Sequence, residues 1–343
     1  MVEKKRLGST DVYVSEQGLG CMGMSSSYSI SQLNDEESLK VLTRAADLGI
    51  TFWDTSDVYG PFTNEKLIGR WFKENGRRSE IFLCTKFAIL LNSDGSLGLR
   101  GDPEYVKSSC NASLERLGVE YIDLYYQHRV DPLVPIEKTV EAMVELIKEG
   151  KVKHLGLSEC SADTLRRAHK IHPIAAVQME YSPFALEIES EQTKLLDTCR
   201  ELGVSIVAYS PLGRGMLTGA IRSRADFEPT DFRSWAPRFS EGNFELNLKL
   251  VDGIEAIAKK RGCTPGQATL AWIAAQGNGV NIFPVPGTKR VKYLEENASA
   301  TKIKLSEEEK SEIRKLSEAT EVRGERYPGM LMDACFADSP PLQ

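Results

Sequence analysis

Three consecutive stretches decide the fold: IFLCTKF at residues 81–87, PEYVKSSCNASLERLG at 103–118 and YIDLYYQH at 121–128. The outer two are short apolar runs rich in β-branched and aromatic residues, which is typical of buried strands. The middle stretch repeats apolar residues at steps of three and four and ends in Gly118, as an amphipathic helix does. A strand, a helix and a strand in this order predict a parallel pair joined by a crossover helix.

The same alternation continues on both sides of this unit. Further apolar runs predict strands at 17–22, 51–56, 152–158, 175–181, 204–210 and 281–287. Helical periodicity is found at 36–49, 135–150, 162–172, 191–203, 246–262, 264–277, 291–300 and 305–319. Eight strand units of this kind favour a closed (β/α)₈ TIM barrel of class α/β over an open sheet. We expect one domain spanning 1–343, with an N-terminal β-hairpin at 6–15 plugging the barrel bottom and extra C-terminal helices.

Composition narrows the function classes. The net charge of -6 gives no basic surface for nucleic acid or an anionic membrane, and no apolar run is long enough to cross a bilayer. The N-terminal residues lack the apolar core of a secretory signal. Seven scattered cysteines fit reduced thiols in a cytoplasmic protein and argue against structural zinc. His169 and His172 have a spacing that metals use, but with no third ligand nearby we expect no metal site.

Gly18, Gly20 and Gly23 form the pattern G-x-G-x-x-G, which occurs in dinucleotide-binding folds. That use requires a helix to open at the third glycine, so that its N-terminus meets the pyrophosphate. Here the chain continues with the polar run MSSSYSISQLND at 24–35, so we expect the helix to begin only near Asp35. We therefore interpret these glycines as part of a first barrel strand that allows close backbone approach.

Polar side chains follow several of the predicted strands at their carboxyl ends, where barrel enzymes carry their chemistry. The second strand ends in Asp54 with Tyr59 in the next loop, the third carries Lys86, and the fourth ends at His128. Asp54, Tyr59 and His128 could each be structural. Lys86 lies in an apolar stretch, however, and a buried ammonium needs a partner, for which Asp54 is the nearest candidate.

Together these four residues suggest the reduction of a carbonyl group, which needs a hydride on carbon and a proton on oxygen. Tyrosine is a poor acid at neutral pH, and a neighbouring ammonium lowers its pKa. We expect Lys86 to supply that charge to Tyr59, Asp54 to hold Lys86, and His128 to orient the substrate oxygen.

The four residues stand in FWDTSDVYG, CTKF and DLYYQHR, and in this setting the chain resembles the aldo-keto reductase superfamily. The resemblance runs from about Leu7 to about Ser317 and includes GLSECS, QMEYSP, AYSPLGRG and PVPGTKRVKYLEEN in order. It is greatest to the perakine reductase-like and YakC-like branch. The resemblance implies NAD(P)H-dependent carbonyl reduction, with Tyr59 as the proton donor.

The loops after the seventh and eighth strands, 210–215 and 287–290, combine glycines with basic residues and predict an anion site. An ordinary glycine-proline turn is the alternative. The resemblance implies specific contacts: Ser158 and Gln178 to the nicotinamide carboxamide, Tyr209 to its ring, Ser210, Leu212 and Arg214 to the pyrophosphate, Gly287 with Lys289 and Arg290 around the 2′-phosphate, and Glu296 and Asn297 to the adenosine. The paired bases favour NADPH over NADH.

Residues 213–243 form a long irregular segment after the seventh strand. It could close over the cofactor as a lid, with Phe232, Trp235 and Phe239 lining the substrate pocket. The same aromatics could equally pack on the barrel exterior. From about Val322 the sequence predicts no structure for the tail.

Two other functions remain open. A regulatory subunit could bind NADPH with little turnover, although a pure binder needs no proton donor. An aldolase could use Lys86 as a Schiff base, but this leaves Tyr59 and the basic loop unexplained. The partner that we expect is a small-molecule carbonyl substrate. Neither its identity nor the oligomeric state can be read from the sequence.

Overall fold

The computed structural model describes all residues of the chain except 1, 27, 29–32, 93, 95 and 343. Eight parallel strands form one sheet in which spatial order follows chain order. They are β3 (Leu19–Gly20), β4 (Phe52–Asp54), β5 (Phe82–Phe87), β8 (Ile122–Gln127), β9 (Val152–Ser158), β10 (Ile174–Glu180), β11 (Ser205–Tyr209) and β12 (Ile282–Pro284). Each lies within one residue of its predicted run, so the predicted strands are confirmed.

The first and last strands meet and close the barrel. The backbone N–H of Gly18 donates to the carbonyl of Pro284 at 3.0 Å, and that of Gly20 donates to Pro286 at 3.2 Å. A Cβ on Gly20 would lie 2.8 Å from the carbonyl oxygen of Val285, so only glycine permits this approach. Gly18 and Gly20 of the G-x-G-x-x-G pattern thus serve barrel closure, whereas Gly23 lies in the 3₁₀ helix Met22–Met24 and makes no close approach. Helix α1 begins at Asp35, as predicted.

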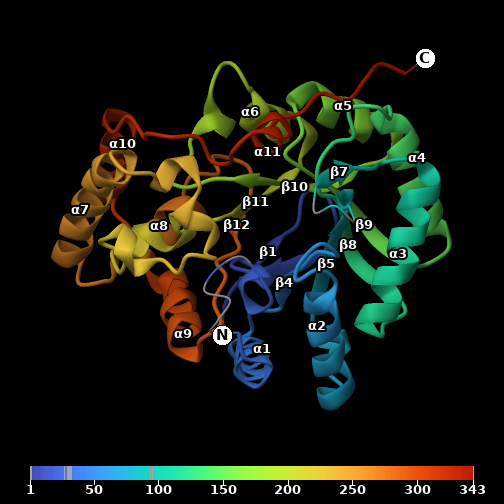
Figure 1. The fold of residues 1–343 in the computed structure, drawn as a ribbon, viewed down its shortest axis with the longest axis horizontal. Coiled ribbons are helices and arrows are strands. Elements are labelled where there is room, and N and C mark those ends of the chain that lie inside the picture. The colour runs from blue at the N-terminus through green and yellow to red at the C-terminus, as the bar shows by residue number, and fades with distance from the viewer. Residues whose placement is uncertain (1, 27, 29–32, 93, 95, 343) are drawn as a thin grey trace.

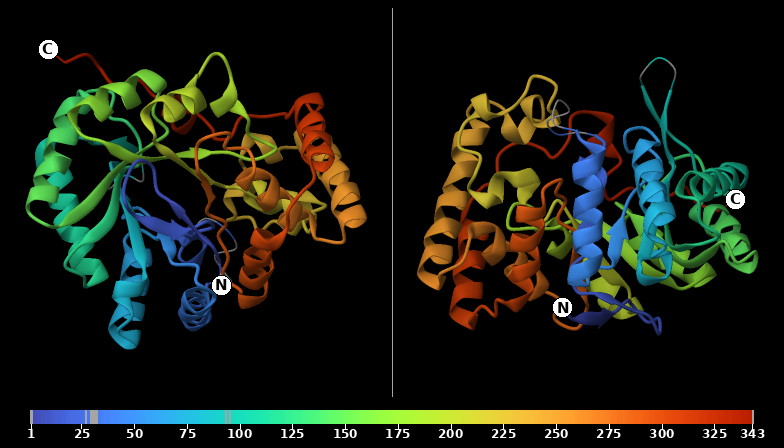
Figure 2. Two further views of the ribbon diagram at one scale, coloured as in Figure 1. Left: turned by 180° about the vertical axis from the view of Figure 1, so that it is seen from behind. Right: turned by 90° about the horizontal axis from the view of Figure 1, so that it is seen from below.

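Helices surround the sheet (Figures 1 and 2). They are α1 (Asp35–Leu48), α2 (Thr63–Asn75), α3 (Pro103–Leu117), α4 (Ile136–Lys148), α5 (Ala162–Ile171), α6 (Leu195–Leu202), α7 (Asn243–Arg261), α8 (Pro265–Ala274), α9 (Val291–Ser299), α10 (Glu307–Ala319) and α11 (Met330–Asp333). Helix α3 shows how the sequence sets its ends. Asp102 accepts a hydrogen bond from the N–H of Tyr105, Pro103 stands at the first turn, and Gly118 ends the helix with φ 62°.

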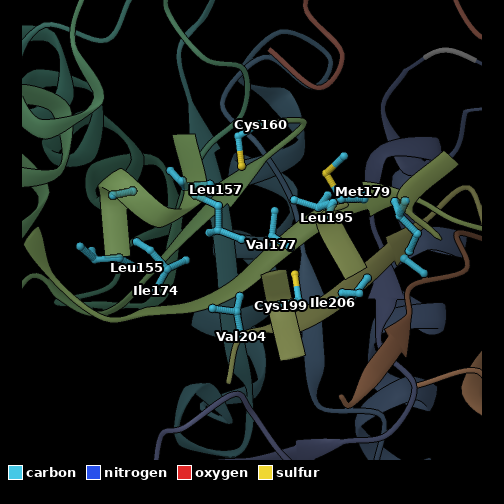
Figure 3. Packing of buried hydrophobic residues seen from close by; sticks show 14 of the residues in the cluster. Leu155, Leu157, Cys160, Ile174, Val177, Met179, Leu195, Cys199, Val204 and Ile206 are labelled. Atoms are coloured by element: carbon cyan, nitrogen blue, oxygen red, sulfur yellow. The ribbon is translucent and has the colours of Figure 1, made fainter. Parts of the chain in front are cut away.

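The main core lies between the sheet and the outer helices. Figure 3 shows strand residues Leu155, Leu157, Val177 and Ile206 packed with Leu195 and Cys199 of α6. All six side chains are fully buried. Each large aliphatic side chain buried in this way contributes about 1.5–3 kcal/mol to the stability of the fold. Helix α6 therefore turns its apolar face toward the sheet.

The predicted N-terminal hairpin is confirmed as β1 (Lys4–Arg6) paired antiparallel with β2 (Tyr13–Ser15). The N–H of Gly8 in its turn donates to Oγ of Ser205, the first residue of β11, so the hairpin covers the N-terminal end of the barrel. Strands β6 (Ile89–Leu91) and β7 (Leu97–Leu99) form a second hairpin, which the sequence did not predict. It projects from the opposite end, beyond β5 (Figure 2).

The segment at 213–243 and the C-terminal tail have different local structures. Residues 213–242 form four short 3₁₀ helices, and α7 begins only at Asn243, which confirms the irregular segment. The tail leaves α10 and runs past α6 and α5 (Figure 1). The N–H of Ser161 donates to Ala337, and Arg167 donates to the carbonyls of Ser339 and Pro340. Within the described part of the chain, no helix has the length and apolarity that a membrane span requires.

Candidate active site

The four predicted catalytic residues lie at one end of the barrel. Asp54 is the last residue of β4, Lys86 is the last but one of β5, and His128 follows β8 directly. Tyr59 lies in the loop between β4 and α2. The N–H of His128 donates to the carbonyl of Phe87 at 2.8 Å, which fixes the end of β8 beside that of β5. Parallel strands all point the same way, and this brings residues far apart in sequence to one mouth.

Lys86 is the centre of the group. Its ammonium donates to Oδ1 of Asp54 at 2.5 Å, to the carbonyl of Thr55 at 2.8 Å and to the hydroxyl of Tyr59 at 3.2 Å. All three donor positions of the ammonium are used, so the buried charge is fully satisfied. The predicted pairing of Lys86 with Asp54 and its proximity to Tyr59 are both seen in the structure.

The pKa values of this group correct one prediction. Burial lowers the pKa of Lys86, but Asp54 and Tyr59 outweigh it, so the pKa stands above its ordinary value. For Tyr59, burial raises the pKa and Lys86 lowers it, and burial is the larger effect. The expected net lowering of the Tyr59 pKa is therefore wrong. Burial destabilises the phenolate form of Tyr59 by removing it from water. The ammonium of Lys86 offsets only part of this free energy, because Asp54 already neutralises its charge.

His128 faces the same mouth. Its ring lies 5.9 Å from that of Tyr59, centroid to centroid, and nearly perpendicular to it. Its Nδ1 lies 3.1 Å from Oγ of Ser56. Burial, with Lys86 and Arg129 nearby, holds the pKa of His128 well below its usual range. The imidazole is therefore neutral and carries a single N–H.

The residues assigned to the nicotinamide adjoin this group. Ser158 ends β9 and is in register with Gln178 of β10. The side-chain N–H of Gln178 donates to Oδ2 of Asp54 at 2.7 Å, so one carboxylate contacts both Lys86 and Gln178. Tyr209 ends β11, and its hydroxyl donates to Oε1 of Glu159 at 2.8 Å.

The residues assigned to the phosphates and adenosine lie on the loops after β11 and β12 and on α9. Ser210, Gly213, Arg214 and Gly215 all have positive φ, which turns the backbone sharply. Arg214 is nearly buried, and its Nη1 has no hydrogen-bond partner among the described residues. Arg290 stands at the N-terminus of α9, where a helix attracts anions. This unsatisfied buried guanidinium atom and the basic helix start fit a phosphate-bearing cofactor.

The other residues assigned to the phosphates and adenosine lie nearby in the chain or the fold. Leu212 adjoins Gly213, and Gly287 forms a β-bridge with Gly20. The ammonium of Lys289 lies 3.4 Å from the carbonyl of Tyr28. The carboxylate of Glu296 accepts a hydrogen bond from the hydroxyl of Thr264, and Asn297 is buried.

Sequence reasoning missed a buried ionic cluster beside the residues predicted to hold the nicotinamide. Arg326 of the tail lies 3.2 Å from Glu159 and 4.0 Å from Glu180, and all three side chains are at most 2% exposed. The hydroxyl of Tyr327 donates to that of Tyr209 at 3.2 Å. Glu159 and Glu180 stand at strand ends and could have been suspected on that ground. No local pattern marks Arg326, because its partners lie far away in the sequence.

The three aromatics of the 213–243 segment have different surroundings. Phe239 is buried in a cluster with Phe244 of α7 and Leu217 of the loop after β11, and Phe232 packs against the same cluster. Trp235 is more than half exposed. Phe232 lies 6.0 Å from Tyr327, ring to ring, and so belongs to the mouth. Phe232 thus joins this cluster to the ring of Tyr327, while Phe239 lies within the cluster.

Residues 17–318 match the family model described as Aldo/keto reductase family. The chain belongs to the aldo/keto reductase family. This aldo/keto reductase is 55% identical over 334 residues to aldo-keto reductase str7 of Strobilurus tenacellus, with 96% of each chain covered. It is 51% identical over 326 residues to aldo-keto reductase yakc [NADP(+)] of Schizosaccharomyces pombe, with 95% of each covered.

Solved structures agree with the fold of this aldo/keto reductase. The thermostable aldo-keto reductase Tm1743, in complex with the inhibitor epalrestat, is similar with a TM-score of 0.73 and 30% identity over 92% of this chain and 100% of that one. The glycerol dehydrogenase AKR11B4 from Gluconobacter oxydans has a TM-score of 0.82 over 95% of this chain and 98% of that one. At 24% identity, the latter likeness shows the fold alone.

Proposed function

We propose that this aldo/keto reductase is an NADPH-dependent enzyme that reduces aldehydes or ketones to alcohols, with Tyr59 as the proton donor. The observation that carries the proposal is the contact between Tyr59 and Lys86, 3.2 Å from hydroxyl to ammonium, beside the buried Asp54. A proton donor held against a fixed cation is what a carbonyl reductase needs once hydride reaches the carbon.

Each residue then has a role that follows from its surroundings. Tyr59 has a raised pKa and so carries its proton at neutral pH, ready to donate it to the substrate oxygen. Lys86 stabilises the phenolate that this donation leaves behind, and Asp54 holds the ammonium in place. Neutral His128 can donate one hydrogen bond to the same oxygen and orient it.

NADPH, when bound, supplies the hydride. The residues that would hold it are those named from the resemblance: Ser158, Gln178, Tyr209, Ser210, Leu212, Arg214, Gly287, Lys289, Arg290, Glu296 and Asn297. The name of the relative yakc [NADP(+)] supports the choice of cofactor. Lys289 and Arg290, next to the N-terminus of α9, are suited to a 2′-phosphate.

The two alternatives are less well supported. An aldolase needs a neutral amine on Lys86, whereas the raised pKa of Lys86 keeps it an ammonium. A regulatory subunit needs no proton donor, yet Asp54, Lys86 and Tyr59 are in direct contact.

The test is NADPH oxidation by the purified protein against a panel of aliphatic and aromatic aldehydes, dicarbonyls and ketones. We expect substrate-dependent turnover with at least one class and measurable NADPH binding without substrate. NADPH binding with no turnover across the panel would instead favour the regulatory subunit.

We also propose that residues 1–343 act as one reductase domain on a small-molecule carbonyl substrate. The family match alone spans 17–318, and the hairpin and tail contact the barrel at its two ends. The free cysteines suit a reducing compartment such as the cytoplasm.

A further inference from the structure

Ser56 and Asp57 occupy the loop between Asp54 and Tyr59, and neither has a role in the proposed reaction. Both are buried, with exposures of 0% and 3%. The N–H of Asp57 donates to the carbonyl of Lys86 at 3.2 Å, so the loop continues alongside β5 past the end of β4. This backbone contact directs the two side chains toward the end of β8.

One hydroxyl joins a buried carboxyl group to the catalytic imidazole. Oγ of Ser56 lies 3.2 Å from Oδ1 of Asp57 and 3.1 Å from Nδ1 of His128. The carbonyl oxygen of Lys86, at 3.4 Å, is a more distant alternative acceptor. Ser56 has a single proton to donate, so it can serve only one of these acceptors at a time.

This choice matters because His128 is neutral. A neutral imidazole has one N–H, and the partner of one ring nitrogen decides which nitrogen carries the proton. If Ser56 donates to Nδ1, then Nε2 must carry the hydrogen. If Nδ1 carries it, then Nε2 can only accept.

We propose that Asp57 and Ser56 form a relay that sets the tautomer of His128 according to the protonation state of Asp57. When Asp57 is protonated, its hydroxyl donates to Ser56, Ser56 donates to Nδ1 of His128, and Nε2–H faces the reacting oxygen. When Asp57 loses its proton to solvent, Ser56 turns its hydroxyl to the carboxylate, since a charge-assisted hydrogen bond is about twice as strong as a neutral one. The single proton of His128 then resides on Nδ1 and donates to Ser56.

The surroundings set this change near neutral pH. Burial raises the pKa of Asp57 to about 7, with Glu65 of α2 acting in the same direction. The pKa of Asp57 is lowered, to a smaller extent, by Ser56, by the N–H of Val58 and by Arg116 of α3. Tyr105 and Tyr125 also face Asp57, from α3 and β8.

The other end of the relay stays uncharged. The groups facing His128 are Lys86 and Arg129, which disfavour its protonation, together with Tyr59 and Ser56. Because His128 remains neutral across this range, the ionisation of Asp57 changes the position of its proton and not its charge.

The consequence for catalysis rests on the proposed reductase function. Below about pH 7 the Nε2–H of His128 would donate to a carbonyl oxygen, which favours binding of the carbonyl substrate. Above that pH Nε2 would accept a hydrogen bond from a hydroxyl, which favours binding of the alcohol. Ser56 and Asp57 are thus positioning residues that set which of the two His128 can hold at a given pH.

The test is nitrogen NMR of the full chain labelled in histidine, without cofactor or substrate. The chain has four histidines, and a His128→Gln sample assigns the signals of His128. We expect the Nδ1 and Nε2 shifts of the wild-type protein to exchange character with a midpoint near pH 7. Asp57→Asn, whose amide always donates, should hold the Nε2–H form throughout the titration.

Ser56→Ala should also abolish the pH dependence of the His128 tautomer, because the link is removed. Ser38→Ala is the matched control, since Ser38 is a buried serine of α1 whose hydroxyl makes no hydrogen bond among the described residues. It should leave the titration unchanged. A wild-type tautomer that is constant from about pH 5.5 to 8.5, or a transition that persists in Asp57→Asn, would overturn the relay. Absence of reductase activity would sink the proposed function but leave this NMR result standing.

Discussion

The ammonium of Lys86 lies 2.5 Å from Oδ1 of Asp54, and the two side chains are 0% and 5% exposed. A buried ion pair of this kind is costly to break, because the remaining partner is left as an uncompensated charge in a medium that solvates it poorly. Asp54 also accepts from Gln178, so its position is shared by the proposed catalytic group and the predicted nicotinamide site.

Replacing Lys86 alone should therefore destabilise the fold. We expect Lys86→Met to lower the free energy of unfolding by about 3–5 kcal/mol in urea at neutral pH. The double variant Asp54→Asn, Lys86→Met should recover part of that loss, since no buried charge is left unpaired. Lys292→Met, at an exposed site on α9, is the control and should stay within about 0.5 kcal/mol of wild type. Equal losses in the single and double variants would contradict the pairing argument.

Tyr59→Phe tests the proton donor. We expect turnover to fall by roughly 10²–10⁴-fold, because the hydroxyl that protonates the substrate is gone. NADPH affinity, followed by fluorescence titration, should stay close to wild type. Tyr13→Phe, at a side chain that is 59% exposed, is the control. Turnover near the wild-type level in Tyr59→Phe would remove this residue as the acid.

The pH dependence of reduction tests the pKa of Tyr59. Reduction needs the protonated phenol, and burial raises the pKa of Tyr59 above its ordinary value of 10. Rate is therefore retained below that pKa and lost as the pH rises through it. The measurement is made in Asp57→Asn, because this variant removes the ionisation of Asp57 near pH 7. We expect its kcat for reduction to stay level up to about pH 9.5. A fall with a midpoint below the ordinary value of 10 would mean that Lys86 outweighs burial after all.

Lys289 and Arg290 test the cofactor preference. We expect the double variant Lys289→Ala, Arg290→Ala to raise KM for NADPH roughly 10- to 100-fold, which corresponds to losing about 1.5–3 kcal/mol of hydrogen bonding to a charged group. KM for NADH should change little, since NADH lacks the 2′-phosphate. Lys292→Ala, two residues further along the same segment, serves as the control. A parallel rise for both cofactors would show that these bases do not read the 2′-phosphate.

Arg326 tests the anchoring of the tail. Arg326→Met leaves Glu159 buried without its tail partner, and we expect hydrogen–deuterium exchange across residues 326–339 to speed up roughly 100-fold. Arg323→Met removes an exposed arginine that pairs only with Glu321 among the described acidic residues, and it should leave exchange unchanged. Identical exchange in both variants would mean that the tail is held by its contacts at 337–340 alone.

The barrel and the convergence of Asp54, Lys86 and His128 could be predicted because each rests on local patterns. Eight apolar runs alternate with helical periods, except between 51–56 and 81–87, where α2 was not predicted, and parallel strands must place their carboxyl ends together. Asp54, Lys86 and His128 each stand at such an end, so their convergence followed from strand direction alone. The glycines at 18 and 20 could likewise be assigned to close backbone approach because no helix follows them.

What only the tertiary structure decided depends on the sum of surroundings or on partners distant along the chain. The pKa of Tyr59 is a balance between burial, which raises it, and the ammonium of Lys86, which lowers it. Lys86 could be predicted from the sequence, but the extent of burial could not. Arg326 pairs with Glu159, which is 167 residues away in the sequence, and Ser56 contacts His128, which is 72 residues away. No local pattern marks either pair. Periodicity specifies which face of an element is buried, but desolvation and long-range hydrogen bonding are fixed only when the whole chain has packed.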